Sequence, residues 1–169
     1  MCYNIVRKGI IMKKNTLFIL LILCGMFLIC GCGRNIKKLG ESIEFNTSNC
    51  KVENEIDTHG GFLGDGEYFA KITCSKIEEL STHWKELPVS SLIDYPTKMK
   101  TCTGNGCNDI YDRFNIPNIK NGYYYFHDRH SLATNEYSDL GLNNRSSWNF
   151  TLAILDIDTN IIYYYELDT

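Results

Sequence analysis

The chain has 169 residues, of which 44% are hydrophobic, 22% are charged and 8 are cysteines. This length gives room for one modest domain and excludes a multidomain enzyme. The composition is close to that of globular proteins, which excludes both a disordered chain and a protein with many membrane spans.

The N-terminal segment has the pattern of an export signal. Lys13 and Lys14 precede an apolar run at residues 17–29, and small residues follow at Gly31-Cys32. The pattern is complete from Met12 onward, which makes Met12 a candidate for the true start of the chain. Residues 17–32 are fewer than the roughly 20 that a membrane-spanning helix needs. We therefore expect a signal peptide at residues 1–31 rather than an uncleaved anchor.

The end of this segment, Ile29-Cys30-Gly31-Cys32, resembles the lipobox of bacterial lipoproteins, in which signal peptidase II cuts just before a lipidated cysteine. The resemblance implies a mature chain that begins at Cys32, carries acyl chains such as palmitate there, and stays on the extracytoplasmic face of the cell membrane. Two or more acyl chains hold a protein stably in a bilayer. Residues 32–41 then form a polar, lipidated linker to a single domain at residues 42–169.

The charge of the exported part narrows the choice of partners. Residues 1–31 contain four of the 17 basic residues and none of the 20 acidic ones, so the rest of the chain has a net charge of −7. That excess of acid argues against nucleic acid as a partner, because binding to phosphates needs clustered Lys and Arg. We expect no cofactor.

Four cysteines remain beside the lipidated one, and an even number permits disulfides in an oxidising compartment. Cys102 and Cys107 enclose a turn-rich loop of four residues, so a bridge between them is the first candidate, and Cys50 and Cys74 are then the remaining pair. Three connectivities are possible. Free buried thiols stay open as an alternative, while the spacing lacks the close pairs of a structural zinc site.

The hydrophobic periodicity predicts an α+β domain, with a small antiparallel sheet and one main packed helix, preceded by the signal-peptide helix. Strands are expected at residues 50–56, 67–74 and 123–128, and a C-terminal hairpin at 148–167. Ser75 and Glu78 have capping-box spacing before apolar residues at helical intervals, which predicts the main helix at 75–87. A short helix is expected near residues 109–114, and residues 131–147 form a polar loop.

Consecutive tyrosines at residues 123–125 and 163–165 must place rings on both faces of their strands. One of these faces belongs to the core. The other is either a tyrosine-rich surface for contact with protein or carbohydrate, or a face that a helix covers.

Two segments hold the candidate site residues, the glycine-rich loop at 57–67 and the end of the aromatic strand. The candidate ligand-binding residues are Asp57, His59, Asp65, His127, Arg129 and His130. The loop is neither a P-loop nor an EF-hand, and no nucleophile motif is present, so we assign no catalytic residue and no metal ligand. In the alternative interpretation, the acids of the loop hydrogen-bond only their own backbone.

We therefore expect a surface interaction module or ligand-binding module, with a protein or a carbohydrate as its ligand, rather than an enzyme. The competing hypothesis is a metal-dependent hydrolase at the cell surface that uses His59, Asp65 and His130. Imidazole and carboxylate are suitable ligands for divalent metals, and convergence of the three side chains would favour this hypothesis.

The segments DTHGGFLGDGEYF, FHDRH and NFTLAILDIDTNIIYYYELDT resemble a family of small uncharacterised bacterial proteins, many of them lipoproteins, that share an Asp-Thr-His-Gly-Gly-Phe loop. The resemblance covers residues 57–169 and implies one domain with a shared glycine-rich loop, but no activity. The chain departs from the family at Leu63, where relatives have His, and this difference weakens the metal hypothesis.

Overall fold

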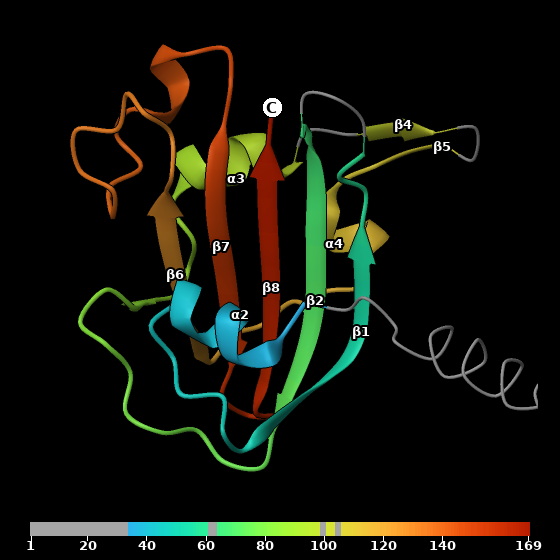
Figure 1. The fold of residues 1–169 in the computed structure, drawn as a ribbon, viewed down its shortest axis with the longest axis vertical. Helices are drawn as coiled ribbons and strands as arrows, with labels where there is room; N and C mark the ends of the chain where they lie inside the picture. The colour runs from blue at the N-terminus through green and yellow to red at the C-terminus, as the bar shows by residue number, and fades with distance from the viewer. Residues whose placement is uncertain (1–33, 61–63, 99–100, 104–105) are drawn as a thin grey trace, which may run out of the picture. The chain divides into compact units, whose positions relative to one another are not determined.

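The computed structural model describes residues 34–60, 64–98, 101–103 and 106–169 (Figure 1). The predicted signal peptide, the lipidation at Cys32 and the family difference at Leu63 lie outside these residues. Within the described ranges, no helix is both long enough and apolar enough to cross a membrane.

The domain is built on a six-stranded antiparallel sheet with the strand order β1-β2-β8-β7-β6-β3. Its strands are β1 (Cys50–Asp57), β2 (Gly66–Cys74), β3 (Lys85–Glu86), β6 (Gly122–Asp128), β7 (Asn149–Asp156) and β8 (Ile161–Asp168). The C-terminal meander β6–β7–β8 joins the β1–β2 hairpin through the pairing of β8 with β2. The antiparallel sheet and the C-terminal hairpin are therefore confirmed. The short strand β3 was not predicted and falls inside the helix expected at 75–87.

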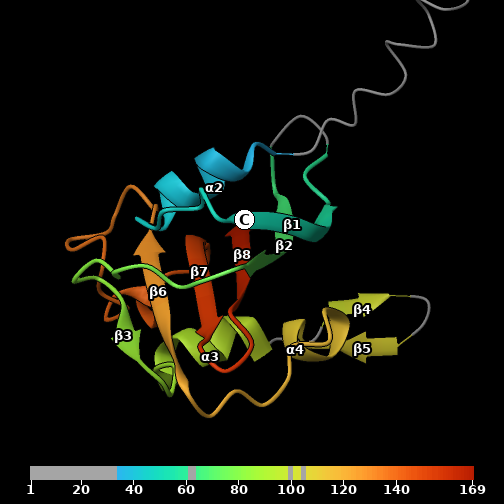
Figure 2. The same ribbon diagram turned by 90° about the horizontal axis from the view of Figure 1, so that it is seen from below.

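Short helices cover both faces of the sheet (Figure 2). Helix α2 (Ile36–Ser42) lies on one face, and α3 (Ser91–Lys98), α4 (Ile110–Arg113) and a 3-10 helix (Leu142–Asn144) lie on the other. Neighbouring tyrosines of β8 pack alternately into the two cores. Tyr164 packs on the side of α2, and Tyr165 packs on the side of α4. The expected alternative of a covered tyrosine face is therefore the correct one.

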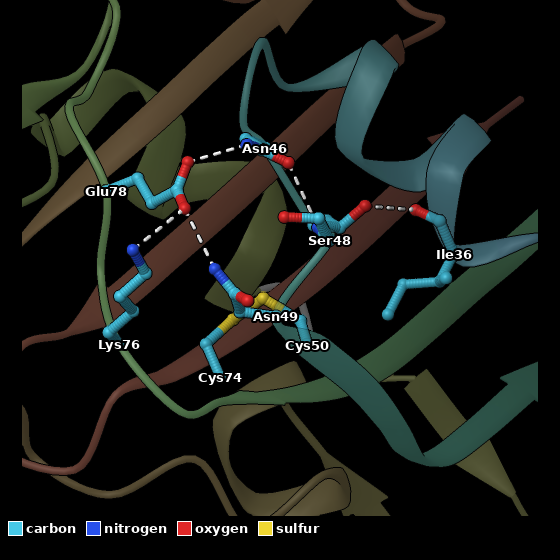
Figure 3. Close-up of a disulfide and its surroundings, with 9 residues drawn as sticks. Ile36, Asn46, Ser48, Asn49, Cys50, Cys74, Lys76 and Glu78 are labelled. Carbon is cyan, nitrogen blue, oxygen red and sulfur yellow. Dashed lines mark hydrogen bonds and ion pairs between the residues drawn. A yellow bond between two sulfur atoms is a disulfide. The ribbon is translucent and has the colours of Figure 1, made fainter.

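Residues 75–84 are not helical, so the main helix expected at 75–87 is wrong. Glu78, the expected capping residue, instead accepts hydrogen bonds from the side chains of Asn46 and Asn49 at 2.6 and 2.8 Å (Figure 3). Trp84 is buried, and its indole N–H donates to the carbonyl of Ile43 at 3.0 Å. These tertiary contacts outweigh a weak local preference for helix.

Residues 34–41 of the expected polar linker are instead part of the domain, whose compact unit begins at Arg34. Asn35 caps α2 by accepting a hydrogen bond from the backbone N–H of Lys37 at 2.9 Å. Leu39 is 2% exposed and packs into the core. Gly40 has no room for a side chain, because a Cβ would lie 2.6 Å from the carbonyl oxygen of Phe45. Helix α2 thus packs on one face of the sheet.

A disulfide joins Cys50, the first residue of β1, to Cys74, the last residue of β2 (Figure 3). Cys50 and Cys74 are the two cysteines that the expected pairing of Cys102 with Cys107 leaves over. Strands β4 (Thr101–Thr103) and β5 (Gly106–Asn108) form a separate hairpin in which Cys102 lies opposite Cys107. The side chains of this second pair lie outside the described part of the chain, so the bridge between them stays a prediction.

Candidate functional site

The glycine-rich loop folds back on itself where β1 ends. The backbone N–H of Thr58 donates to the carbonyl of Glu67 at 2.9 Å, and the Thr58 hydroxyl accepts from the Glu67 N–H at 2.8 Å. A Cβ at Gly66 would lie 2.6 Å from the Cα of His59. Glycine at position 66 therefore allows His59 to lie against β2, with its ring directed toward β8.

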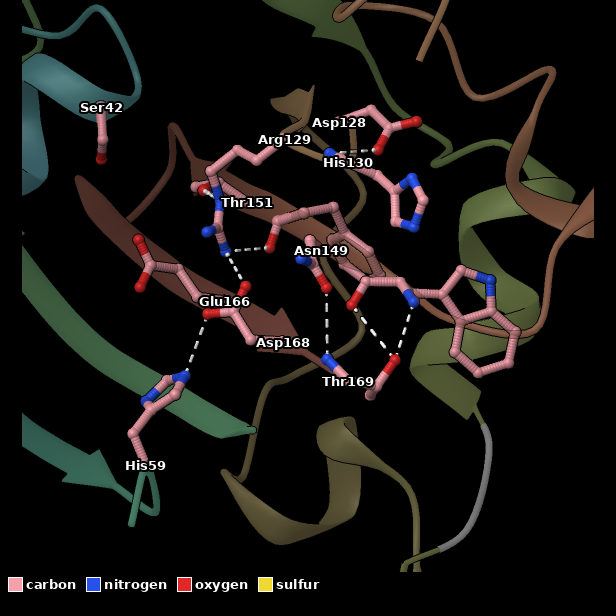
Figure 4. A network of polar contacts seen from close by, with 12 residues as sticks. Ser42, His59, Asp128, Arg129, His130, Asn149, Thr151, Glu166, Asp168 and Thr169 are labelled. Atoms are coloured by element: carbon pink, nitrogen blue, oxygen red, sulfur yellow. Dashed lines mark hydrogen bonds and ion pairs between the residues drawn. The ribbon is translucent and has the colours of Figure 1, made fainter. Parts of the chain in front are cut away.

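His59 bridges two carboxylates, of which Figure 4 shows one, that of Asp168. Its Nδ1 lies 2.7 Å from Asp57 Oδ1, and its Nε2 lies 3.0 Å from Asp168 Oδ2. The ring therefore links the end of β1 to β8 through both of its nitrogens. Partial burial tends to raise the pKa of Asp57, but the hydrogen bonds from the backbone and ring of His59 lower it by more. The pKa of Asp57 is therefore below its ordinary value.

Arg129 lies on the other side of Asp168, with Nη2 at 3.0 Å from Oδ1 of that carboxylate. Its guanidinium also donates to the Thr151 hydroxyl at 3.0 Å and to the Phe150 carbonyl at 3.1 Å. The structure therefore brings Asp57, His59 and Arg129 together, and it does so through a residue that the sequence analysis did not select.

Two residues before Asp168 on β8, Glu166 is buried and accepts hydrogen bonds from Arg34 and from the Tyr164 hydroxyl. Burial tends to lower the pKa of the Arg34 guanidinium, but the charge and hydrogen bond of Glu166 outweigh this effect, and the pKa is raised. Burial, and then the charge of Glu166, raise the pKa of Tyr164. The name β8 network is used below for the charged residues at this end of the strand: Arg34, Asp57, His59, Arg129, Glu166 and Asp168.

The β8 network satisfies its own charges. Three carboxylates meet two guanidinium groups and one imidazole, each within hydrogen-bonding distance of an opposite partner. The nearby Ser42 hydroxyl bonds to the Leu39 carbonyl and the Tyr164 hydroxyl, both at 2.8 Å. Such an arrangement ties the loop after β1, the end of β6 and the start of α2 to β8, and it offers no nucleophile–base pair.

The other three predicted site residues lie apart from the β8 network. His130 Nε2 contacts the Ser147 hydroxyl at 3.1 Å, and its Nδ1 accepts from the N–H of Leu132 at 3.1 Å. His127 lies 3.4 Å from a carboxylate oxygen of Glu136. Asp65 is exposed. Across residues 34–60, 64–98, 101–103 and 106–169, no group of three His, Cys, Asp or Glu side chains could hold a metal ion.

Next to the β8 network, a buried ion pair fixes the polar loop at residues 131–147. Arg145 Nη2 donates to Asp128 Oδ1 at 2.6 Å, and the two side chains are 8% and 2% exposed. The same carboxylate oxygen accepts from the backbone N–H of His130 at 3.2 Å. The loop is therefore held by a pair of charges that is almost fully removed from water.

The face of the sheet opposite to the β8 network, on the side of α3 and α4, carries a groove with a volume of about 330 Å³. Its walls and floor are mostly apolar and include Leu87, Val89, Ile116, Ile119 and Ile154. On one side, Asp94 accepts a hydrogen bond from Lys98 at 2.6 Å and a longer one from the Tyr111 hydroxyl at 3.4 Å. An apolar hollow of this size with a few polar groups on one side is typical of ligand sites.

Helix α4 positions one wall of the groove. Its Arg113 donates two hydrogen bonds to the carboxylate of Glu67, at 2.6 and 2.8 Å, and Tyr165 donates to the same carboxylate at 2.9 Å. The hydrogen bond with Glu67 raises the pKa of Arg113, against the effect of burial. A planar fork on a carboxylate is among the stronger polar contacts in proteins, so this wall is well held.

Neither Asp168 nor the groove was predicted, although the sequence contains signals for both. Glu166 and Asp168 are two residues apart in an aromatic strand, which places both acids on one face. Asp94 and Lys98 have the spacing of an ion pair on a helix, but Pro96 lies between them and argues against a helix there.

The groove and the β8 network differ in what they leave open to a partner. The charges of the network are engaged with one another, whereas the groove is an apolar hollow with a half-exposed ion pair on one side.

No family model matches the chain, and no curated protein and no solved structure matches it either.

Proposed function

We propose that this chain is an exported, lipid-anchored binding module on the extracytoplasmic face of the cell membrane, and that it takes a small apolar ligand in the groove. Residues 1–31 act as the signal peptide, and Cys32 carries the lipid. The observation that carries the binding function is the apolar groove of about 330 Å³ with Asp94, Lys98 and Tyr111 on one side. The Cys50–Cys74 disulfide supports export, because disulfides persist in oxidising compartments.

The geometry gives less support to the alternative of a metal-dependent hydrolase using His59, Asp65 and His130. His59 is engaged with Asp57 and Asp168, while His130 bonds to Ser147 and to its own loop. The β8 network is equally poor as a ligand site, since a ligand would have to break contacts between opposite charges. The groove needs no such rearrangement.

The anchor is tested by intact mass and detergent partitioning of the protein from cells that express the wild type, Cys32→Ala or Cys30→Ala. We expect a mass of residues 32–169 plus diacylglycerol for the wild type and for Cys30→Ala, and loss of this species for Cys32→Ala. Cys30→Ala is the matched control, because it removes a thiol from the same segment. A full-length chain in the membrane or an unmodified soluble chain contradicts the anchor.

The groove is tested by titrating the protein with indole, a small apolar probe, and following nuclear magnetic resonance shifts. Val89→Arg places a long charged side chain in the groove wall and should abolish the shifts. Ile56→Arg is the matched control, because Ile56 is 41% exposed on the edge strand β1 and is not part of the groove. Shifts that persist in Val89→Arg, or that do not occur in the wild type, contradict binding in the groove.

A further inference from the structure

The ion pair beside the groove has bonding capacity left over. A carboxylate offers about four acceptor positions and an ammonium group three donors. Among the described residues, the Asp94 carboxylate accepts from Lys98 and Tyr111 only, and the Lys98 ammonium donates to Asp94 only. Both side chains reach water, with Asp94 26% and Lys98 56% exposed. A ligand can therefore bond to either charge without separating the pair.

The two charges also lie next to each other in a defined order. Asp94 and Lys98 are one turn apart on α3, and the distance between Asp94 Oδ2 and Lys98 Nζ is 2.6 Å. A ligand with one charge would gain from one of these groups and be repelled by the other. A ligand that carries an ammonium and a carboxylate side by side can face both groups, each with its opposite charge, and the two attractions add.

On the strength of the proposed binding function, we infer that the groove recognises an apolar α-amino acid, or the same head group on a closely related molecule. The ammonium of the ligand bonds to Asp94, its carboxylate bonds to Lys98, and its side chain enters the apolar part of the groove formed by Val89, Ile116 and Ile154. The inference rests on the apolar groove together with the complementary order of the two charges at its side.

The test compares three probes with one phenyl ring and different heads, using isothermal titration calorimetry on the detergent-extracted protein. The probes are L-phenylalanine, phenethylamine and 3-phenylpropanoate, which have both charges, the ammonium alone and the carboxylate alone. We expect L-phenylalanine to bind about tenfold more tightly than either of the others, since it makes two charge-assisted contacts instead of one. Val89→Arg should abolish its binding.

Two variants separate head recognition from apolar binding. Asp94→Asn and Lys98→Gln should each weaken L-phenylalanine about tenfold and leave the indole titration unchanged. The matched control is Lys37→Gln, which removes one partner of another exposed i,i+4 ion pair, Lys37–Glu41 in α2, on the other face of the sheet. This control should change neither titration.

The outcomes distinguish the inference from the proposed function. If indole binds and the three phenyl probes bind equally, the groove is a ligand site but recognition of the zwitterionic head is wrong. If L-phenylalanine binds equally well to Val89→Arg, its site lies elsewhere and the inference is wrong. If neither indole nor L-phenylalanine binds, the proposed binding function fails together with the inference.

Discussion

The β8 network and the groove lie on opposite faces of the same sheet and use charged side chains in opposite ways. In the network, His59 and Arg129 hold Asp168 from two sides, and Glu166 is buried beneath Arg34. Beside the groove, Asp94 and Lys98 form a single ion pair in contact with water. The comparison shows that a dense cluster of charges is not by itself a site, because charges that satisfy one another have little left for a ligand.

The largest expected effect is a difference in the free energy of unfolding between two Asp→Ala variants, one in a buried ion pair next to the β8 network and one in the ion pair beside the groove. Asp128→Ala leaves Arg145 buried without its partner and should lower the free energy of unfolding by about 3–5 kcal/mol. Asp94→Ala removes a partner of a half-exposed pair and should cost less than about 1 kcal/mol. Urea denaturation of both variants measures this. Equal losses would contradict the distinction between the buried Asp128–Arg145 pair and the half-exposed Asp94–Lys98 pair.

The next largest effect concerns β1, which is tied covalently at Cys50 and by the β8 network at Asp57. Replacing Cys50 and Cys74 together by Ala should cost about 3.5 kcal/mol, as the chain-entropy estimate gives for a loop with a sequence separation of 24. The comparison is a denaturation experiment with and without reductant. Reductant should destabilise the wild type more than the double variant, which retains only the predicted Cys102–Cys107 bridge, and an equal response of both would contradict the prediction.

The ionic tether of β1 should be weaker than the covalent one. His59→Ala removes the bridge between Asp57 and Asp168 and should cost about 1 kcal/mol, since the ring is mostly but not fully buried. Hydrogen exchange should become faster at the N–H groups of Thr58 and His59 and remain unchanged at those of β7. Faster exchange throughout the sheet would mean that His59 supports the whole fold rather than the loop.

The smallest effect is a pH dependence of stability. Burial tends to raise the pKa of Glu44, but hydrogen bonds from Tyr137 and His83 outweigh it, and the pKa lies below its ordinary value of 4.5. The stabilisation is therefore complete above pH 4.5 and is lost as the pH falls through the lower folded value. Glu44→Gln should flatten the acid side of a plot of unfolding free energy against pH. An unchanged curve would contradict a role for this carboxylate.

The strands were predictable because their signal is local. Alternation of apolar residues identified the long strands, and the turn-like residues 156–160 identified the C-terminal hairpin. The main helix was not predictable in the same way. Ser75 and Glu78 carry the spacing of a helix start, yet Glu78 bonds to Asn46 and Asn49 instead. Local spacing shows what a residue can do, and tertiary contacts decide which of its options is realised.

The site was predicted only in part, for a related reason. Asp57, His59 and Arg129 were selected as candidates, and the structure brings them together at Asp168. The partner of His59 lies 109 residues further along the chain, and that of Arg34 lies 132 residues further along. His127 and His130 were selected for their residue type and their place at the end of the aromatic strand, and each contacts a different partner.

The sequence by itself determined the strands, the possibility of a Cys50–Cys74 pair and the prediction of a lipid anchor at Cys32, because each depends on neighbouring residues or on the number and spacing of the cysteines. Only the tertiary structure decided which helix covers which face, that the charges near Asp168 satisfy one another, and that a groove forms beside Asp94 and Lys98. These features depend on contacts across the sheet, and the energies of such contacts are set by burial and geometry that no local pattern contains.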